Sequence, residues 1–174
     1  KLAAIGGEQS EVSYLNTSVG LHFRRRVIWL IGLAFVSIVT GYVMYRFSHL
    51  LEQASVLSLF LPMVVAAGGN SGGQAATMVI RAMALGEINP GNALRIAWKE
   101  ARTGLFLGLS LGVAIAAFIT LILPHLQPNT QAHFDFPHLA FAVAAAITLQ
   151  VLSATVLGAL LPLGARAIKL DPAV

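Results

Sequence analysis

The segment from Leu61 to Ile80 carries no charged side chain and is long enough to cross a lipid bilayer as a helix. Its middle is interrupted by glycines and polar side chains, in the run from Gly68 to Gln74. An amide without a hydrogen-bond partner costs several kcal/mol in hydrocarbon, so backbone of this kind has to face protein or water. A water-filled path across a membrane is one structure that would place it there.

The composition is typical of a membrane protein. Hydrophobic residues make up 57% of the 174 residues and charged residues 10%, whereas soluble domains carry about 25% charged residues. The Lys and Arg residues behind the net charge of +4 lie between apolar segments, which is the pattern of topology signals. We therefore expect membrane lipid, and no nucleic acid, as a partner. The chain has no Cys, which excludes disulfides and thiolate metal sites.

Four apolar segments have the length of transmembrane helices and predict an all-α, polytopic membrane protein. They are residues 27–45, 54–80, 103–123 and 139–165. Residues 1–26 are less apolar and are interpreted as a cytoplasmic linker or interfacial segment, with the transmembrane domain over residues 27–174. Near the end, Asp171 and Pro172 suit the cap and first position of a helix, which predicts a fifth span after Val174.

Basic residues gather on one side of these spans. They precede the first span, separate the second from the third and follow the fourth: Arg24, Arg25 and Arg26; Arg81, Arg95, Lys99 and Arg102; Arg166 and Lys169. By the positive-inside rule, the N-terminus, the second connection and the C-terminus are cytoplasmic in a multi-pass protein of the plasma membrane. The third connection, residues 124–138, has no Lys or Arg and is expected to face outward.

The second connection is expected to include a cytoplasmic helix. Asn89 and Pro90 suit its cap and first position, and Glu100 is expected to join Lys99 or Arg102 in exposed ion pairs. At the N-terminus, the three consecutive arginines could bind anionic lipid, although a topology anchor is their more ordinary role.

A helix through the second span would gather small and polar residues on one face. The face holds Pro62, Ala66, Asn70, Gly73 and Thr77, with Gln74 beside them. Small residues leave room and amides supply dipoles, which suits Mg²⁺ because this ion keeps several of its waters. The same pattern also suits close helix packing. Two amides in one span favour a pore, with Ala66, Gly69 and Asn70 as lining residues and Gly73, Gln74 and Thr77 as weaker candidates.

Two other sites are weaker. The run Gly69-Asn-Ser71-Gly72 matches the pattern around the nucleophile of rhomboid intramembrane proteases, but that chemistry needs a His base and all five His lie at or outside the span ends. We therefore expect no catalytic residue, no bound cofactor and no enzyme. The third connection contains residue types that could bind a divalent metal: His125, His133, Asp135 and His138. Such residues in a loop are more often simply solvated.

No carboxylate falls within a predicted span. All seven lie outside: Glu8, Glu11, Glu52, Glu87, Glu100, Asp135 and Asp171. A divalent cation at the bilayer centre normally needs compensating negative charge. Either the chain is not a cation pathway, or the carboxylate lies beyond Val174.

Residues 62–84 resemble the second transmembrane helix of the MgtE magnesium channels and transporters. Matches over nearly the whole chain support the resemblance: Lys1-Leu2 with Gly6, residues 26–30, Trp98 to Glu100, Gly158 to Pro162 and Leu170 to Ala173. Thr155 departs from it, since some relatives have asparagine there.

The resemblance implies a homodimeric helix bundle with five helices per subunit and a pore on the two-fold axis. Hydrated Mg²⁺ would be the transported ion, held by an acidic residue of the fifth helix, with Asn70 as the pore-facing asparagine and a carbonyl from Ala66. Cytosolic N and CBS domains that sense Mg²⁺ are possible in the full-length protein. The expected function is passage of hydrated divalent cations down their electrochemical gradient; the alternative is a membrane scaffold or dimerisation module without transport.

Overall fold

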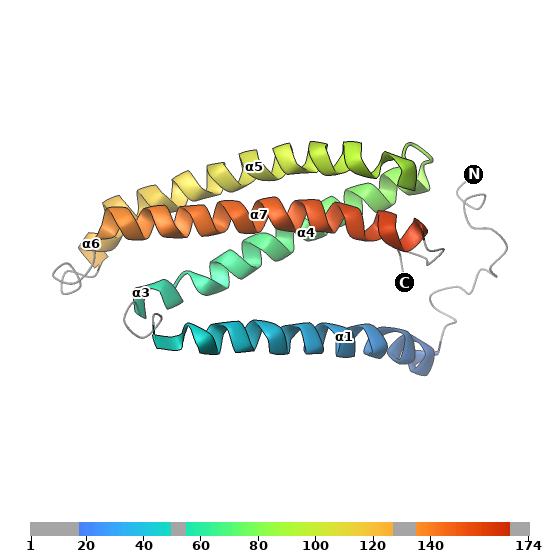
Figure 1. Ribbon diagram of the computed structural model, residues 1–174, viewed down its shortest axis with the longest axis horizontal. Helices are drawn as coiled ribbons and strands as arrows, with labels where there is room; N and C mark the ends of the chain where they lie inside the picture. The colour runs from blue at the N-terminus through green and yellow to red at the C-terminus, as the bar shows by residue number, and fades with distance from the viewer. Residues whose placement is uncertain (1–17, 50–54, 127–134, 168–174) are drawn as a thin grey trace. The chain divides into compact units, whose positions relative to one another are not determined.

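The computed structural model describes residues 18–49, 55–126 and 135–167, which are almost entirely helical (Figure 1). The helices are α1 (Val19–Arg46), α3 (Ser55–Ser58), α4 (Leu61–Ala84), the 3₁₀ turn η2 (Pro90–Asn92), α5 (Ala93–Ala117), the π-helical segment η3 (Phe118–Ile122), α6 (Leu123–Leu126) and α7 (Phe136–Ala167). The predicted all-α class is confirmed, since these described residues contain no strand. The chain divides into one unit that holds α1 and a second unit over residues 54–173.

Helix α1 begins ahead of the predicted span 27–45. Ser18 is its N-cap and accepts a hydrogen bond from the Leu21 amide at 3.4 Å. The arginine Arg24 therefore lies on the helix, and the apolar stretch Leu30–Arg46 follows it.

Helix α4 runs unbroken through the glycine-rich motif. A turn at Leu59 and Phe60 separates it from α3, so the predicted segment 54–80 is divided there and not at the glycines. Pro62 lies in the first turn, where the missing amide costs no helical hydrogen bond. Within the motif, the Ser71 hydroxyl donates to the Ala67 carbonyl at 2.7 Å, so this hydroxyl, like the main-chain amides, is satisfied inside the helix.

A short turn joins α4 to α5. The Gly86 amide bonds the Met83 carbonyl and the Glu87 amide bonds the Ala82 carbonyl, and Gly86 has a positive φ of 72°. This Schellman pattern ends α4 and favours glycine at that position. The Asn89 amide then donates to the Asn92 side chain at 3.0 Å, and a helix begins there as predicted.

That helix continues into the third predicted span without a break. Residues Pro90–Leu126 form 37 consecutive helical residues, so the predicted connection 81–102 shrinks to the turn between α4 and η2. The only ion pair among the described residues joins Asp135 and His138. The expected ion pairs of Glu100 with Lys99 or Arg102 are therefore not formed.

Helix α7 packs against both α4 and α5, and α5 runs alongside it (Figure 1). Glycines at four-residue intervals on α5, namely Gly104, Gly108 and Gly112, are buried in this contact. A Cβ on Gly108 would lie 2.8 Å from the Thr148 Cα, so the two backbones touch. The core is accordingly centred on α7, where Ile147 and Val151 are almost fully buried.

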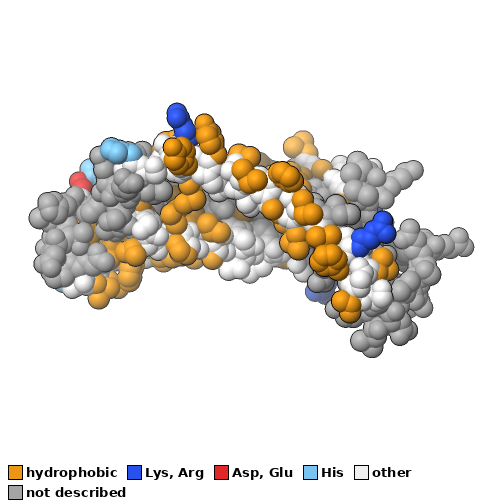
Figure 2. All heavy atoms as spheres, turned by 90° about the horizontal axis from the view of Figure 1, so that it is seen from below, with side chains coloured by type: hydrophobic (Ala, Val, Ile, Leu, Met, Phe, Trp, Pro, Cys, Tyr) orange, Lys and Arg blue, Asp and Glu red, His pale blue; other side chains and the backbone are white. Residues whose placement is uncertain are grey.

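Two of the described helices are long and apolar enough to cross a membrane. They are Pro90–Leu126, with a mean hydropathy of 2.5 over its most apolar part, and Phe136–Ala167, with 2.0. Large hydrophobic side chains are exposed on them, including Phe106, Val113 and Phe141. Figure 2, which is seen from below the view of Figure 1, shows hydrophobic side chains spread over that face of the described residues as well. Such a surface is suited to lipid.

Candidate functional site

The glycine-rich motif of α4 is divided between two faces of the helix. One face is buried against α7 and includes Gly68, Ala75, Val79 and Met83. The other face is exposed and contains every residue that the sequence predicts as pore-lining. We call this set the polar stripe: Ala66, Gly69, Asn70, Gly73, Gln74 and Thr77.

The buried glycines serve helix packing. A Cβ on Gly68 would overlap the side-chain amide of Gln150, and a Cβ on Gly72 would lie 2.9 Å from the Ala154 carbonyl oxygen. On α7, Gly158 lies against the Gly72 carbonyl group. The packing interpretation of the motif is therefore correct for this face.

The exposed glycines have no such role in this chain. A Cβ on Gly69 or Gly73 would meet no atom within 4 Å. Contact with α7 thus explains half of the glycines in the motif and leaves the other half facing open space beside Asn70 and Gln74.

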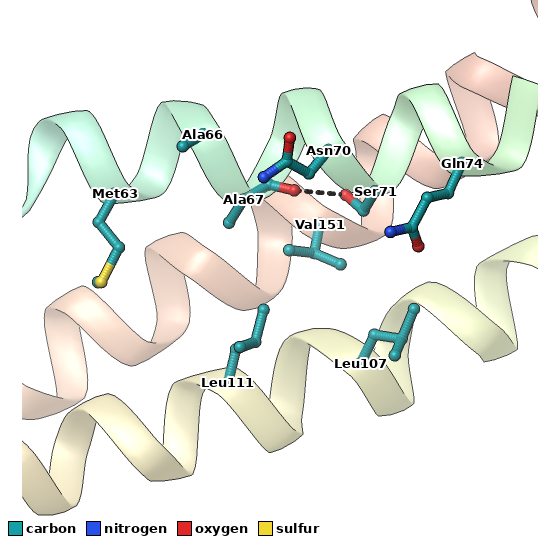
Figure 3. Close-up of a pocket in the computed structure, with 9 residues that line it drawn as sticks. All are labelled: Met63, Ala66, Ala67, Asn70, Ser71, Gln74, Leu107, Leu111 and Val151. Atoms are coloured by element: carbon teal, nitrogen blue, oxygen red, sulfur yellow. Dashed lines mark hydrogen bonds between the residues drawn. The ribbon is translucent and has the colours of Figure 1, made fainter.

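A groove lies next to the polar stripe, between α4 and α5 (Figure 3). Its volume is about 340 Å³, and its lining comes from three helices: Met63, Ala66, Ala67, Asn70, Ser71 and Gln74 of α4, Leu107 and Leu111 of α5, and Val151 of α7. Figure 3 shows Leu107 and Leu111 extending from α5 toward α4, and the Gln74 amide extending from α4 toward α5. The sequence predicted three of these residues, Ala66, Asn70 and Gln74.

The groove is uncharged. Its polar groups are the Asn70 and Gln74 amides and the Ser71 hydroxyl, and none of its lining residues is Asp, Glu, Lys or Arg. Such a lining can orient water molecules through amide dipoles, but it offers no full charge to a cation. Six lining residues were not predicted as pore-lining. Met63, Ala67 and Ser71 lie on α4 itself, and Leu107, Leu111 and Val151 come from other helices, where their apolar side chains gave no signal of a site.

Ser71 has the environment of a structural serine. Its hydroxyl lies 2.7 Å from the Ala67 carbonyl oxygen and 3.2 Å from that of Gly68, both in its own helix. This back-bonding is a common arrangement for serine within helices. The geometry gives the protease interpretation no support.

The acidic and histidine residues before α7 form a pair. The Asp135 carboxylate lies 2.5 Å from the Nδ1 atom of His138. Two hydrogen bonds, first that of the His138 side chain and then that of the His138 backbone amide, lower the pKa of Asp135. His133 lies outside the described residues. No three His, Asp or Glu side chains come together as a metal site within the described parts of the chain.

Thr155 lies in the contact between α5 and α7 and not in the groove. It is buried, and its hydroxyl is 2.9 Å from the Val151 carbonyl oxygen and 3.5 Å from that of Glu100. A Cβ on Gly104 would overlap the Thr155 hydroxyl. The position at which this chain has Thr155 and some relatives have asparagine is therefore a helix-packing position.

Known proteins match the chain over the same helices. Residues 61–174, which include all of α4, α5 and α7, match the MgtE family, described as a divalent cation transporter. Over 150 residues, 86% of this chain, the sequence is 33% identical to the magnesium transporter MgtE of Bacillus subtilis and 31% identical to that of Thermus thermophilus. The chain spans 30–31% of the length of these relatives. It therefore belongs to the MgtE family, whose members are transporters and not enzymes.

Proposed function

We propose that this chain is the pore-forming part of a magnesium channel and that the polar stripe of α4 lines the path of the hydrated ion. The observation that carries the proposal is the division of the glycine motif. Gly68 and Gly72 are taken up by packing on α7, whereas Gly69 and Gly73 face open space on either side of Asn70. A motif needed only for packing within this chain gives no reason for glycine at the exposed positions.

The chemistry of the stripe suits an ion that keeps its water. Mg²⁺ dehydrates reluctantly and usually keeps several waters when bound to protein. The Asn70 and Gln74 amides can accept hydrogen bonds from those waters, and the glycines leave space for the hydration shell. The main-chain carbonyl of Ala66, one turn before Asn70, adds a further acceptor on the same side.

Charge compensation comes from outside the groove. Because the lining residues include no carboxylate, the negative charge that a dication needs in a membrane has to be brought by another segment facing the stripe. We place this carboxylate on a further helix after Val174. A homodimer would set two stripes around one axis, with cytosolic Mg²⁺-sensing domains as possible regulators.

Transport is passive in this scheme. The N-terminus is cytoplasmic, and hydrated Mg²⁺ moves inward across the plasma membrane, since two charges crossing 100 mV gain about 4.6 kcal/mol, at about 2.3 kcal/mol per charge.

The test is Mg²⁺ uptake into liposomes by the complete protein with Asn70→Leu. Loss of an acceptor for a charged, hydrated ion costs about 1.5–3 kcal/mol, so uptake should fall by about tenfold or more and selectivity over Ca²⁺ should weaken. Met78→Leu is the matched control, because Met78 is 69% exposed on α4 but outside the stripe. Unchanged uptake and selectivity with Asn70→Leu would contradict a pore-lining role.

The scaffold alternative predicts no Mg²⁺-dependent uptake by the complete protein at all. It accounts for the buried glycines through packing on α7 and would assign the exposed ones to contact with a second subunit, so Mg²⁺ uptake is the measurement that separates the two functions.

A further inference from the structure

The first turns of α5 present an aromatic side chain surrounded by positive charge. Trp98 is 65% exposed, and the guanidinium carbon of Arg102 lies 5.9 Å from the centre of its ring. Arg95 and Lys99 are exposed within the same two turns. We propose that these four residues, the α5 basic face, bind the phosphate headgroup of an anionic phospholipid.

Within the described ranges of the chain, no acidic side chain forms an ion pair with the cations of the α5 basic face. The only ion pair among the described residues is that of Asp135 and His138, which lies before α7. Glu100, the one acidic residue among these turns, contributes its main-chain carbonyl to a 3.5 Å contact with Thr155. The three cations are therefore available to an external anion.

The arrangement of apolar residues below this face fits a lipid tail. Leu105 follows Trp98 by two helical turns on the same side of α5 and is exposed. The large apolar side chains exposed after Leu105 include Phe106, Leu107 and Leu109. The turns that carry the cations and Trp98 are thus followed directly by a hydrocarbon surface, so an anionic headgroup and its acyl chain would both find complementary side chains on α5.

Trp98 and Arg102 have complementary parts in this site. Tryptophan is enriched at the membrane–water interface because its ring is apolar and its indole N–H is polar. A guanidinium group presents a planar fork of donors that matches phosphate and can stack on an aromatic ring. Trp98 would hold the headgroup region at the membrane surface, and Arg102 would donate to the phosphate.

A phospholipid fits this surface better than its two competitors. Free phosphate has the anion but nothing to cover the apolar side chains that follow Trp98. An acidic protein segment would have to place charge beside Leu105 and Phe106, which are suited to hydrocarbon. The charge and apolar pattern together select a molecule with an anionic head and an apolar tail.

The chain offers a direct spectroscopic reporter for this site. It contains two tryptophans, so the Trp29→Phe variant carries Trp98 alone. This protein is reconstituted into phosphatidylcholine bilayers that contain an equal minor fraction of either brominated phosphatidylglycerol or brominated phosphatidylcholine. Bromine quenches tryptophan fluorescence on contact, so the two samples compare the occupancy of the site by an anionic and a zwitterionic lipid.

Brominated phosphatidylglycerol should quench Trp98 at a lower mole fraction than brominated phosphatidylcholine. Each basic side chain near a membrane favours anionic lipid by about fivefold, equivalent to about 1 kcal/mol. Arg102→Gln should therefore reduce the preference by about fivefold, and Arg102→Lys, which keeps the charge, should retain most of it. Arg166→Gln is the control, because it removes one exposed charge from α7 and should leave the preference unchanged.

Four results would overturn the proposal. Equal quenching by both lipids would show that the site does not select an anionic headgroup. Quenching by neither would show that a protein segment or a second subunit covers Trp98. An equal loss of preference in Arg166→Gln and Arg102→Gln would assign the effect to the general surface potential. Added inorganic phosphate should not reduce the quenching, and if it did, the site would be one for soluble phosphate.

Discussion

Gly158 of α7 lies directly against the main-chain carbonyl group of Gly72 in α4, with no space for a Cβ on Gly158. Close approach of this kind is what small residues allow between membrane helices. It also fixes the rotation of α4 about its axis. With Gly72 turned to α7, the helical period turns Asn70 and Gly73 away from it, so a packing contact determines which residues form the polar stripe.

Gly158→Ala should destabilise the protein by about 1–3 kcal/mol, because the added methyl group would force the two backbones apart. Gly164→Ala is the matched control, since a Cβ there, on the same helix, would meet no atom within 4 Å. The measurement is thermal unfolding in detergent. Equal stability of the two variants would mean that α4 and α7 do not touch at Gly72.

Gly104 and Thr155 should be coupled in stability. Gly104→Ala alone should destabilise the protein, since its Cβ would overlap the Thr155 hydroxyl and lie 3.0 Å from the Leu152 Cα. Thr155→Ala removes the nearer obstacle, so the double variant should recover part of the loss, with an interaction energy of about 0.5–3 kcal/mol.

Thr148→Ala is the control for this pair, because Thr148 faces Gly108 and Gly112 and not Gly104. It should give no recovery when combined with Gly104→Ala. Additive losses in both double variants would contradict a direct contact of Gly104 with Thr155.

The fold was predictable as far as hydrophobic pattern determines it. Apolar runs located the long helices, and Asn89 with Pro90 located a helix start. The ends of α4 and α5 were harder to predict from the sequence. Charged residues such as Arg95 and Lys99 suggested a separate connecting helix, whereas they lie on the exposed end of α5, where charge does not stop a helix. The glycines suggested an interruption, but back-bonding by Ser71 and Thr77 accompanies an intact helix.

The site was predictable only in part, for a geometric reason. A period of 3.6 residues places Ala66, Asn70 and Gly73 on one face, and that assignment needs no knowledge of other helices. Identifying the residues that line the groove opposite this face does require knowledge of the other helices. Leu107 and Val151 line the same groove from segments far along the chain, and nothing in their local sequence distinguishes them from other apolar residues.

Gly73→Val should reduce Mg²⁺ uptake without lowering stability. Its side chain would enter open space beside the stripe, because no atom lies within 4 Å of a Cβ at Gly73. The neighbouring variant Gly72→Val should instead destabilise the protein, since its side chain would meet the Ala154 carbonyl. Uptake into liposomes and thermal unfolding separate the two effects. Normal uptake by a stable Gly73→Val protein would place the ion path elsewhere.

The first turn of α7 should respond to acid through Asp135. One carboxylate oxygen lies 3.3 Å from the His138 amide nitrogen and the other lies 2.5 Å from its Nδ1 atom. These hydrogen bonds, led by that of the His138 side chain, hold the pKa of Asp135 below its ordinary value of 3.8. A lowered carboxyl pKa in the folded state stabilises the turn above pH 3.8, and the stabilisation is lost as the pH falls through the folded-state pKa.

Hydrogen exchange at single amides measures this loss. The protection of the His138 amide, which bonds the carboxylate, should decrease as the pH falls below about 3.8, whereas the Leu139 amide, which bonds the Asp135 main-chain carbonyl, serves as the internal reference. Asn is as good an N-cap as Asp but does not ionise, so Asp135→Asn should keep the protection and remove its pH dependence. If Asp135→Asn shows the same pH dependence as the parent protein, another group controls this helix end.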